Sequence, residues 1–185
     1  LIFTPKTCYS PIEANKNKVW GYTAQLYSLR SENNWGIGDF TDLYQLIEKA
    51  TAQGASTIGI NPLHPLYQNN PAHRSPYSPS SRCFLNPIYI DVTAILNYEN
   101  CKAVQKIVKS SSFKNELLQV KQSDLIDYTG VAKLKFDLIE LLFQDFCNNK
   151  VKKYVKENDD FTDFKQNHGE DLLSLTVFDA LYEHF

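Results

Sequence analysis

Aromatic, hydroxyl and amide side chains gather on one long loop in the first half of the sequence. The loop runs from Pro62 to Arg82 and carries Tyr67 and Tyr77 together with Asn, Ser and His residues. Flat aromatic faces can lie against sugar rings, while the polar side chains can bind sugar hydroxyls. Trp35, on an earlier loop, could act in the same way. Packing in the interior is the commoner use of such rings, so both interpretations stay open at this point.

Cleavage of a glycosidic bond would also require two carboxyl groups, one with a raised pKa so that it can donate a proton. Between residues 20 and 60 the candidates are Glu32, Asp39, Asp42 and Glu48. Asp39 and Asp42 lie at the predicted start of a helix, where the helix dipole lowers the pKa of a carboxyl group. We therefore expect these two to cap the helix, and none of the four makes a convincing proton donor.

Other common catalytic and cofactor-binding motifs are absent from the sequence. The sequence has no GxSxG nucleophile elbow and no phosphate-binding P-loop, and Gly36-Ile-Gly38 lacks the third glycine of GxGxxG. His64 and His73 are nine residues apart, which is poor spacing for two metal ligands on one element. We therefore predict neither a metal site nor a cofactor.

The composition excludes further classes of protein. The 185 residues are 43% hydrophobic and carry a net charge of -2 without a basic cluster, which argues for a folded chain and against a nucleic-acid partner. No run of about eighteen apolar residues exists, so we predict a soluble chain with no membrane span. The widely spaced Cys8, Cys83, Cys101 and Cys147 are expected to be reduced and structural, and we predict a cytoplasmic location.

The two ends of the sequence suggest that it is part of a larger protein. It begins at Leu1, contains no Met, and ends at Phe185 on apolar, helix-compatible residues. An unprocessed gene product begins with Met, so we expect the chain to be a piece of something longer.

A strand, a helix and a second strand are predicted in the first third of the chain. Residues 20–29 alternate in character and are rich in β-forming residues. Asp39 can cap the helix that follows, and Gly54 can end it. Residues 56–61 form a short apolar run, typical of a strand buried on both faces. Together these elements predict a right-handed βαβ unit.

The second half of the chain is predicted to be helical. All eight prolines precede Asn97, and a short strand over 88–92 is the last one expected. Thr129 can cap the strongest of the later helices. Helices are predicted over residues 101–109, 113–120, 131–147 and 171–185.

Four strings of residues occur in the order that is typical of one enzyme family. They are Tyr27-Ser-Leu-Arg-Ser-Glu-Asn-Asn-Trp-Gly-Ile-Gly-Asp-Phe40, Gly59-Ile-Asn-Pro-Leu-His64, Ser75-Pro-Tyr-Ser-Pro-Ser-Ser-Arg82 and Leu85-Asn-Pro-Ile-Tyr-Ile-Asp91. This part of the chain, from about Trp20 to Val92, closely resembles 4-α-glucanotransferase, also called amylomaltase, in its longer bacterial form. Asp127-Tyr128 and Phe178-Asp-Ala-Leu181 resemble the same family more loosely.

The resemblance implies an α/β fold, the (β/α)₈ TIM barrel of the α-amylase clan. This chain would supply part of that barrel and would need the remainder of the same barrel as its partner. Residues 1–19 would lead into the barrel, 20–92 would form its first strands and active-site loops, and 93–185 would form an inserted, mainly helical subdomain.

The resemblance also implies an activity. Members of the family cut an α-1,4-glucan and pass the glucanosyl part to the 4-hydroxyl of glucose or a maltooligosaccharide, without a metal or cofactor. The mechanism retains configuration and uses an Asp nucleophile, a Glu acid and base, and a further Asp. In the family these come from later barrel strands, so we expect no catalytic residue in this chain. A hydrolase of the same clan and a non-catalytic glucan-binding fragment are the alternatives.

The resemblance finally implies glucan-binding residues. Tyr77 matches the tyrosine that, in the family, lines the sugar subsite beside the scissile bond. Asp39 and Asn86 match family strings but could be purely structural. The predicted glucan-binding residues are Trp35, Asp39, Asn61, His64, Ser75, Tyr77, Ser78 and Asn86.

Overall fold

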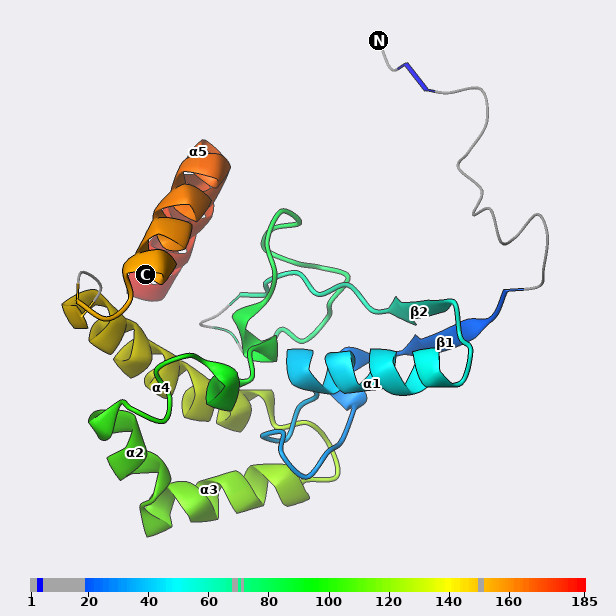
Figure 1. Cartoon of the computed structure of the whole chain (residues 1–185), viewed down its shortest axis with the longest axis horizontal. Helices are drawn as coiled ribbons and strands as arrows, with labels where there is room; N and C mark the ends of the chain where they lie inside the picture. The colour runs from blue at the N-terminus through cyan, green and yellow to red at the C-terminus, as the bar shows by residue number, and fades with distance from the viewer. Residues whose placement is uncertain (1–2, 5–18, 68–69, 71, 150–151) are drawn as a thin grey trace.

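The computed structural model describes residues 3–4, 19–67, 70, 72–149 and 152–185. The strands lie at one end of this part of the chain and the longer helices at the other (Figure 1). Most of the predicted lead-in, 1–19, lies outside the described residues. In chain order the elements are β1 (Gly21–Ala24), η2 (Leu26–Ser28), α1 (Phe40–Ala52), β2 (Thr57–Ile60), η3 (Pro87–Tyr89), η4 (Val92–Ala94), α2 (Lys102–Val108), α3 (Ser111–Gln122), α4 (Tyr128–Asn149) and α5 (Val155–His184), where η marks a 3₁₀ turn.

The strands β1 and β2 pair in parallel, with α1 as the connection between them. Gly21 lies opposite Thr57 in the register, and α1 lies alongside both strands (Figure 1). The predicted βαβ order and the α/β class are confirmed.

The first strand is shorter than the predicted 20–29. It ends at Ala24 because the next turn places Leu26 fully in the core. The Leu26 backbone N–H donates to Asn61 Oδ1 at 2.8 Å instead of to a neighbouring strand. A side-chain acceptor therefore ends the strand pairing here.

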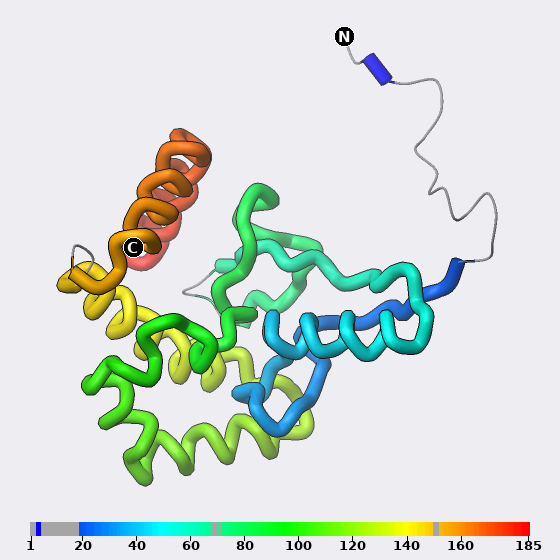
Figure 2. The backbone as a smooth tube through the Cα atoms, viewed as in Figure 1, coloured from blue at the N-terminus to red at the C-terminus, as the bar shows by residue number. Residues whose placement is uncertain are grey.

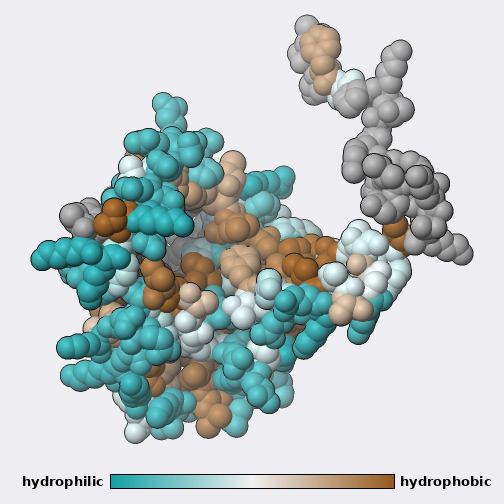
Figure 3. Space-filling model, viewed as in Figure 1, coloured by the Kyte–Doolittle hydropathy of each residue, from teal (hydrophilic) through white to brown (hydrophobic). Residues whose placement is uncertain are grey.

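The expectation that the second strand is buried on both faces is wrong for this chain. Ile60 is 37% exposed, and Thr57 and Gly59 are exposed as well. Among the described residues only β1 pairs with β2, so little covers the sheet. Apolar side chains accordingly lie at the surface around α1 and the strands (Figure 3).

The N-terminus of α1 is capped as predicted. Asp39 Oδ1 accepts the Asp42 backbone N–H at 3.0 Å, and Asp42 Oδ2 accepts the Asp39 N–H at 3.0 Å. This reciprocal capping box satisfies two N–H groups that the helix cannot bond itself. Gly54 has a φ of 85° just beyond the helix, the left-handed conformation that suits glycine at a helix end.

The predicted strand over 88–92 is replaced by the two 3₁₀ turns η3 and η4. Asn86 Oδ1 accepts the Ile88 N–H at 3.0 Å, and Asp91 Oδ1 accepts the Thr93 N–H at 2.9 Å. Such side-chain acceptors compete with a strand ladder for the backbone donors. The apolar pattern correctly predicted that Ile88 and Val92 are buried, but it predicted a strand where the backbone forms 3₁₀ turns.

The helices α2, α3 and α4 confirm three predicted helices, with longer bounds for α3 and α4. Ser110 Oγ accepts the Phe113 N–H at 3.2 Å and starts α3 earlier than expected. Asp127 Oδ1 accepts the Gly130 N–H at 2.9 Å, so Asp127 caps α4 and the predicted cap Thr129 lies inside the first turn. Local side-chain acceptors therefore set both boundaries.

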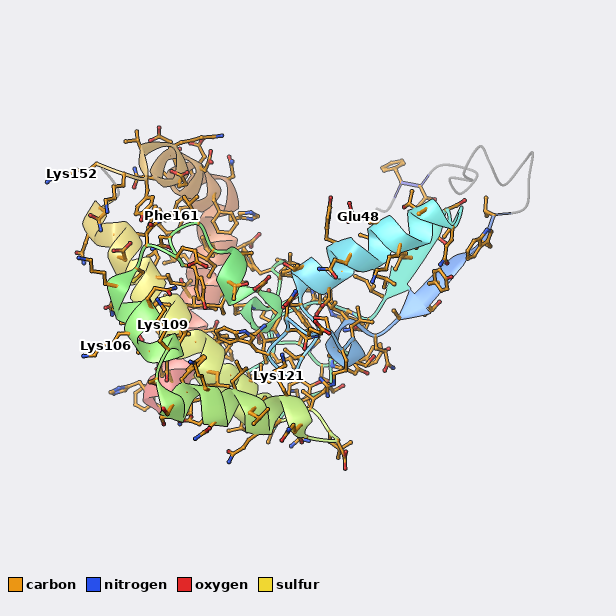
Figure 4. The ribbon with its side chains drawn as sticks, turned by 60° about the horizontal axis from the view of Figure 1, so that its bottom comes forward. Glu48, Lys106, Lys109, Lys121, Lys152 and Phe161 are labelled. Atoms are coloured by element: carbon orange, nitrogen blue, oxygen red, sulfur yellow. The ribbon has the colours of Figure 1, made fainter. Side chains whose placement is uncertain are left out.

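The predicted last helix, from about residue 171, is confirmed as the second segment of α5, while the first segment, which begins at Val155, was not predicted. Gly169 has φ 42° and ψ -120°, so α5 consists of two helical segments at an angle (Figure 4). Phe161, in the first segment, packs against Phe143 and Phe146 of α4 with ring centroids 5.9 and 6.0 Å apart.

One hydrophobic core joins the two halves of the chain. It forms where α2, α3 and α4 pack against the 3₁₀ turns and the 30–38 loop, while α5 has no buried residue. Lys121 of α3 also donates to the Glu32 carbonyl of that loop (Figure 4). The buried core residues are Leu26, Trp35, Ile37, Ile88, Tyr89, Val92, Cys101, Val104, Phe113, Val120, Val131, Leu134, Leu138 and Leu142.

Gly36→Ala is expected to destabilise the protein more than Gly54→Ala. Both glycines have positive φ, 83° and 85°, so an alanine costs about 1 kcal/mol in backbone strain at either site. At Gly36 the added Cβ would also lie 2.6 Å from Val120 Cγ1, whereas at Gly54 nothing lies within 4 Å. We expect this overlap to lower the free energy of unfolding by a further 1–3 kcal/mol, roughly, in urea titrations. Equal destabilisation by the two variants would contradict the close packing of the 30–38 loop on α3.

Candidate functional site

The long loop after β2 is closed at its base by hydrogen bonds between its two limbs. We call residues 62–86 the Tyr77 loop; residues 68, 69 and 71 lie outside the described part of the chain. The Asn86 N–H donates to the Leu63 carbonyl at 2.8 Å, and the Ser80 N–H donates to the Pro65 carbonyl at 2.9 Å. The loop lies between the strands and α4 (Figure 2). These bonds hold its base together, as expected of a functional loop.

The tip of this loop displays Tyr77 to solvent. The Ser78 N–H donates to the Ser75 carbonyl at 3.1 Å, which closes a tight turn around Pro76 and Tyr77. Tyr77 is 71% exposed, and Ser75 and Ser78 are exposed beside it. Three predicted binding residues therefore lie together on one accessible turn, with one aromatic face and three hydroxyls.

His64 lies lower on the loop and is half-buried. Its Nδ1 atom is 3.3 Å from the Phe84 carbonyl oxygen, within hydrogen-bond distance. The ring therefore bridges the two limbs of the Tyr77 loop in this structure.

The two predicted amide residues are buried and bonded to the protein's own backbone. Asn61 accepts the Leu26 N–H and donates from Nδ2 to the Pro62 carbonyl at 2.8 Å. Asn86 caps η3 through Ile88. Asn61 therefore holds the ends of the two strands, and Asn86 holds the base of the loop. For Asn86 this is the structural alternative to glucan binding.

Trp35 is buried in the core instead of lying on an open surface. It is 7% exposed and packs edge-on against Phe113 of α3, with ring centroids 5.3 Å apart. Of the two interpretations of this ring, the structure favours packing.

Asp39 is also enclosed, and the expectation that its pKa is lowered is wrong. Burial raises the pKa of the Asp39 carboxyl group, and the nearby Asp42 carboxylate adds to this effect. The hydrogen bond from the Asp42 N–H acts in the opposite direction but is outweighed. The capping role is confirmed, while the desolvation of the buried carboxyl group outweighs the effect of the helix dipole on its pKa.

Lys135 is a buried charged residue that the sequence analysis did not single out. It is 1% exposed, and its Nζ atom donates to the Ile88 and Ile90 carbonyls, each at 2.8 Å. Burial lowers the pKa of Lys135 to about 8, although nearby carboxylates, Asp39 foremost, oppose this. A buried ammonium group is costly unless it is hydrogen-bonded, as it is here.

The spacing of residues on α4 is a signal in the sequence from which the burial of Lys135 could be predicted. Val131, Leu138 and Leu142 form the buried stripe of the helix. Lys135 lies four residues after Val131 and three before Leu138, on the same face. A lysine within an apolar stripe is therefore the signal for a buried charge.

The described part of the chain holds no cluster of three or more His, Cys, Asp or Glu side chains arranged for a metal ion. Among the helices that the structure describes, none combines the length and apolar character needed to cross a bilayer.

The structure of one solved enzyme is similar to most of this fold. The crystal structure of amylomaltase from Corynebacterium glutamicum is similar to 90% of this chain with a TM-score of 0.76, at 28% sequence identity. The match covers 23% of that protein. The fold is therefore that of part of an amylomaltase-like α/β enzyme.

Sequence comparisons lead to the same family. The 4-alpha-glucanotransferase of Haemophilus influenzae is 41% identical over 181 residues, which are 98% of this chain and 26% of that protein. The 4-alpha-glucanotransferase of Mycobacterium tuberculosis is 42% identical over 102 residues, or 51% of this chain and 14% of that protein. The sequence model described as 4-alpha-glucanotransferase matches residues 24–185. The chain belongs to this family, and it spans about a quarter of the length of the H. influenzae relative.

The buried Lys135 predicts that stability rises with pH between about 8 and 10. The folded protein loses the Lys135 proton near pH 8, while the unfolded chain keeps it up to the ordinary value of 10.5. The unfolded state therefore binds more protons in this range, and the free energy of unfolding should increase by an amount on the order of 2 kcal/mol. Burial raises the pKa of Tyr128 to about 12, which acts in the opposite direction only at higher pH.

Urea unfolding at several pH values measures this effect. Lys135→Met should remove the rise, whereas Lys133→Met should keep it because the Lys133 side chain is 66% exposed. A rise of the same size in Lys135→Met would assign the effect to another group.

Proposed function

We propose that this chain is part of a 4-α-glucanotransferase that transfers segments of α-1,4-glucan to the 4-hydroxyl of glucose or a maltooligosaccharide. The observation that carries the proposal is the family match along residues 24–185. The named activity of the H. influenzae relative, which is similar along nearly the whole chain, supports it.

The βαβ unit would be the start of a (β/α)₈ barrel, and residues 93–185 would form a helical subdomain inserted in that barrel. The parallel pairing of β1 and β2 supports the first point, because barrel strands are parallel and joined by helices. The exposed apolar side chains of this region, which further strands and helices of the barrel would cover, support it as well. They are Trp20, Tyr22, Tyr44, Ile47 and Ile60.

The exposed turn of the Tyr77 loop would be the part of this chain that contacts glucan. The Tyr77 ring can lie flat against a glucose ring, and the Ser75 and Ser78 hydroxyls can bond to sugar hydroxyls. Such contacts would hold the reacting carbon in place and exclude water, which favours transfer over hydrolysis.

The buried and half-buried residues of the predicted set would support this turn instead of contacting sugar. Asn61, His64 and Asn86 bond to backbone groups at the base of the loop. Trp35 and Asp39 fix the 30–38 loop and the start of α1. Their substitution would act on glucan binding through the geometry of the loop.

The bond-breaking carboxylates would come from other strands of the barrel, and the reaction would need neither a metal nor a cofactor. A cytoplasmic location is part of the proposal. The free thiols of Cys83, Cys101 and Cys147 support it, because reduced cysteines are typical of that compartment.

We expect the 185-residue chain by itself to show no disproportionation of maltotriose. Without a nucleophile and a proton donor, a sugar can be positioned but its bond cannot be broken. Chromatography of the purified chain with maltotriose measures this. Sustained release of glucose together with longer oligomers, above a buffer control, would show that the catalytic residues lie within the chain.

The same assay on the full-length protein tests the activity itself. A transferase forms glucose and longer oligomers from maltotriose, while a hydrolase forms only shorter sugars. Binding of maltooligosaccharide without any turnover would instead indicate a non-catalytic glucan-binding protein.

Tyr77→Ala in the full-length enzyme should lower kcat/KM on maltotriose by about 100-fold or more, which corresponds to about 3 kcal/mol of transition-state stabilisation. Because the ring is exposed, the melting temperature should change little. Tyr77→Phe should keep much of the activity if stacking dominates and lose most of it if the hydroxyl bonds to the sugar. A near-normal kcat/KM in Tyr77→Ala would rule out the subsite.

A further inference from the structure

We infer that Lys135 of α4 is a positioning residue for the Tyr77 loop, because its ammonium group holds the two carbonyls on which the base of that loop rests. The inference builds on the proposed function, in which the tip of the loop contacts glucan. It adds a residue 58 positions away in sequence, on a different element.

The two carbonyls belong to Ile88, in the 3₁₀ turn η3 that directly follows the loop, and to Ile90, the residue that caps the end of this turn. Lys135 Nζ lies 2.8 Å from the Ile88 oxygen and 2.8 Å from the Ile90 oxygen. These residues flank Tyr89, which is 4% exposed and packs edge-on against Phe40 of α1. One side chain of α4 therefore sets the distance between α4, the 3₁₀ turn and α1.

A short series of hydrogen bonds leads from this turn into both limbs of the loop. The Ile88 N–H donates to Asn86 Oδ1, and the Asn86 N–H donates to the Leu63 carbonyl. Leu63 lies on the outgoing limb and Asn86 on the returning limb. A shift of Ile88 would therefore move the two limbs together.

A second contact from α4 supports the loop nearer its tip. The Arg74 guanidinium lies 5.8 Å from the centre of the Tyr128 ring, and Arg74 directly precedes the Ser75 turn. Residues of α4 and of the loop also line a cavity of about 30 Å³. Its lining includes Tyr67 and His73 from the loop and Tyr128, Ala132 and Phe136 from α4.

The neighbouring Lys133 shows what an ordinary lysine on this helix does. Its side chain is 66% exposed and pairs with Glu116 of α3 at 3.0 Å. Lys135 instead points into the interior, where the carboxylates of Asp39, Asp91 and Asp42 favour its charged form. The buried position and the bonds to two carbonyls distinguish Lys135 as a support of the base of the loop, beside the α5 rings of Phe178 and Tyr182 that pack against Tyr67.

The test compares Lys135→Met with the matched control Lys133→Met in the full-length enzyme. Each is measured for kcat and KM on maltotriose, for melting temperature, and for hydrogen exchange of peptides covering residues 62–90. We expect Lys135→Met to lower kcat/KM by about tenfold or more through displacement of the turn, and to speed exchange mainly in 62–90. Lys133→Met should match the unmodified enzyme in all of these. Lys135→Arg should recover part of kcat/KM because it keeps the donors and the charge.

A double-mutant cycle with Tyr77→Ala separates positioning from stability. If Lys135 acts through the Tyr77 loop, Lys135→Met should change kcat/KM by less than about threefold in the Tyr77→Ala background. If Tyr77→Ala itself lowers kcat/KM and the two effects multiply, the inference is wrong. Exchange that rises equally along the whole chain would contradict it in any case. Should Lys135→Met fail to fold, Lys135→Gln, which keeps amide donors, takes its place in the cycle.

The outcomes also separate this inference from the proposed function. A normal kcat/KM in Tyr77→Ala would overturn the glucan subsite. If exchange in 62–90 still rose in Lys135→Met alone, the support of the loop by Lys135 would stand. Unchanged exchange in 62–90 would overturn it whatever the kinetics.

Discussion

A lysine ammonium group inside the protein must be hydrogen-bonded, because an unpaired buried charge costs far more than the marginal stability of a domain allows. Lys135 meets this requirement with the Ile88 and Ile90 carbonyls, which belong to the front half of the chain, while Lys135 belongs to the helical half. The elements on both sides are arranged around this contact: α4 on one side, and α1 with the 3₁₀ turns on the other. The shared core then buries apolar side chains from both halves around it.

The candidate site divides into an exposed tip and a buried base. Tyr77 is presented to solvent on a tight turn, while Asn61 and Asn86 are turned inward to backbone groups. This division is physically reasonable, since a binding surface must be accessible and yet held in one geometry. Residues from different strings of the same family can therefore have different tasks, and their burial distinguishes these tasks.

Local patterns predicted most of the helices and the cap of α1, because these depend on neighbouring residues. Asp39, Gly54 and the apolar stripe of α4 are examples. The same patterns missed Asp127 as the cap of α4 and the helical segment that begins at Val155. The patterns failed where distant groups decide the backbone. Residues 88–92 have the apolar pattern of a strand, but Asn86 accepts the Ile88 N–H and the distant Lys135 donates to the Ile88 and Ile90 carbonyls, so these groups are not left for a strand ladder. The prediction of a lowered pKa for Asp39 was wrong for the same reason. Burial raises this pKa, and the burial of a side chain depends on the whole fold. The exposed tip of the loop could be found only from the family resemblance, because its composition alone also fits a packed loop.

The order in which the chain is synthesised gives the Lys135 contact a further consequence. Lys135 follows Ile88 by 47 residues and Ile90 by 45. At about 5–20 residues per second, a ribosome needs roughly 2–9 seconds to make that stretch. During this interval the two carbonyls have no ammonium partner, and the base of the loop cannot reach its final geometry. The strands and α1 can pair before α4 exists, whereas the base of the loop between them and α4 reaches its final geometry only after α4 has been made.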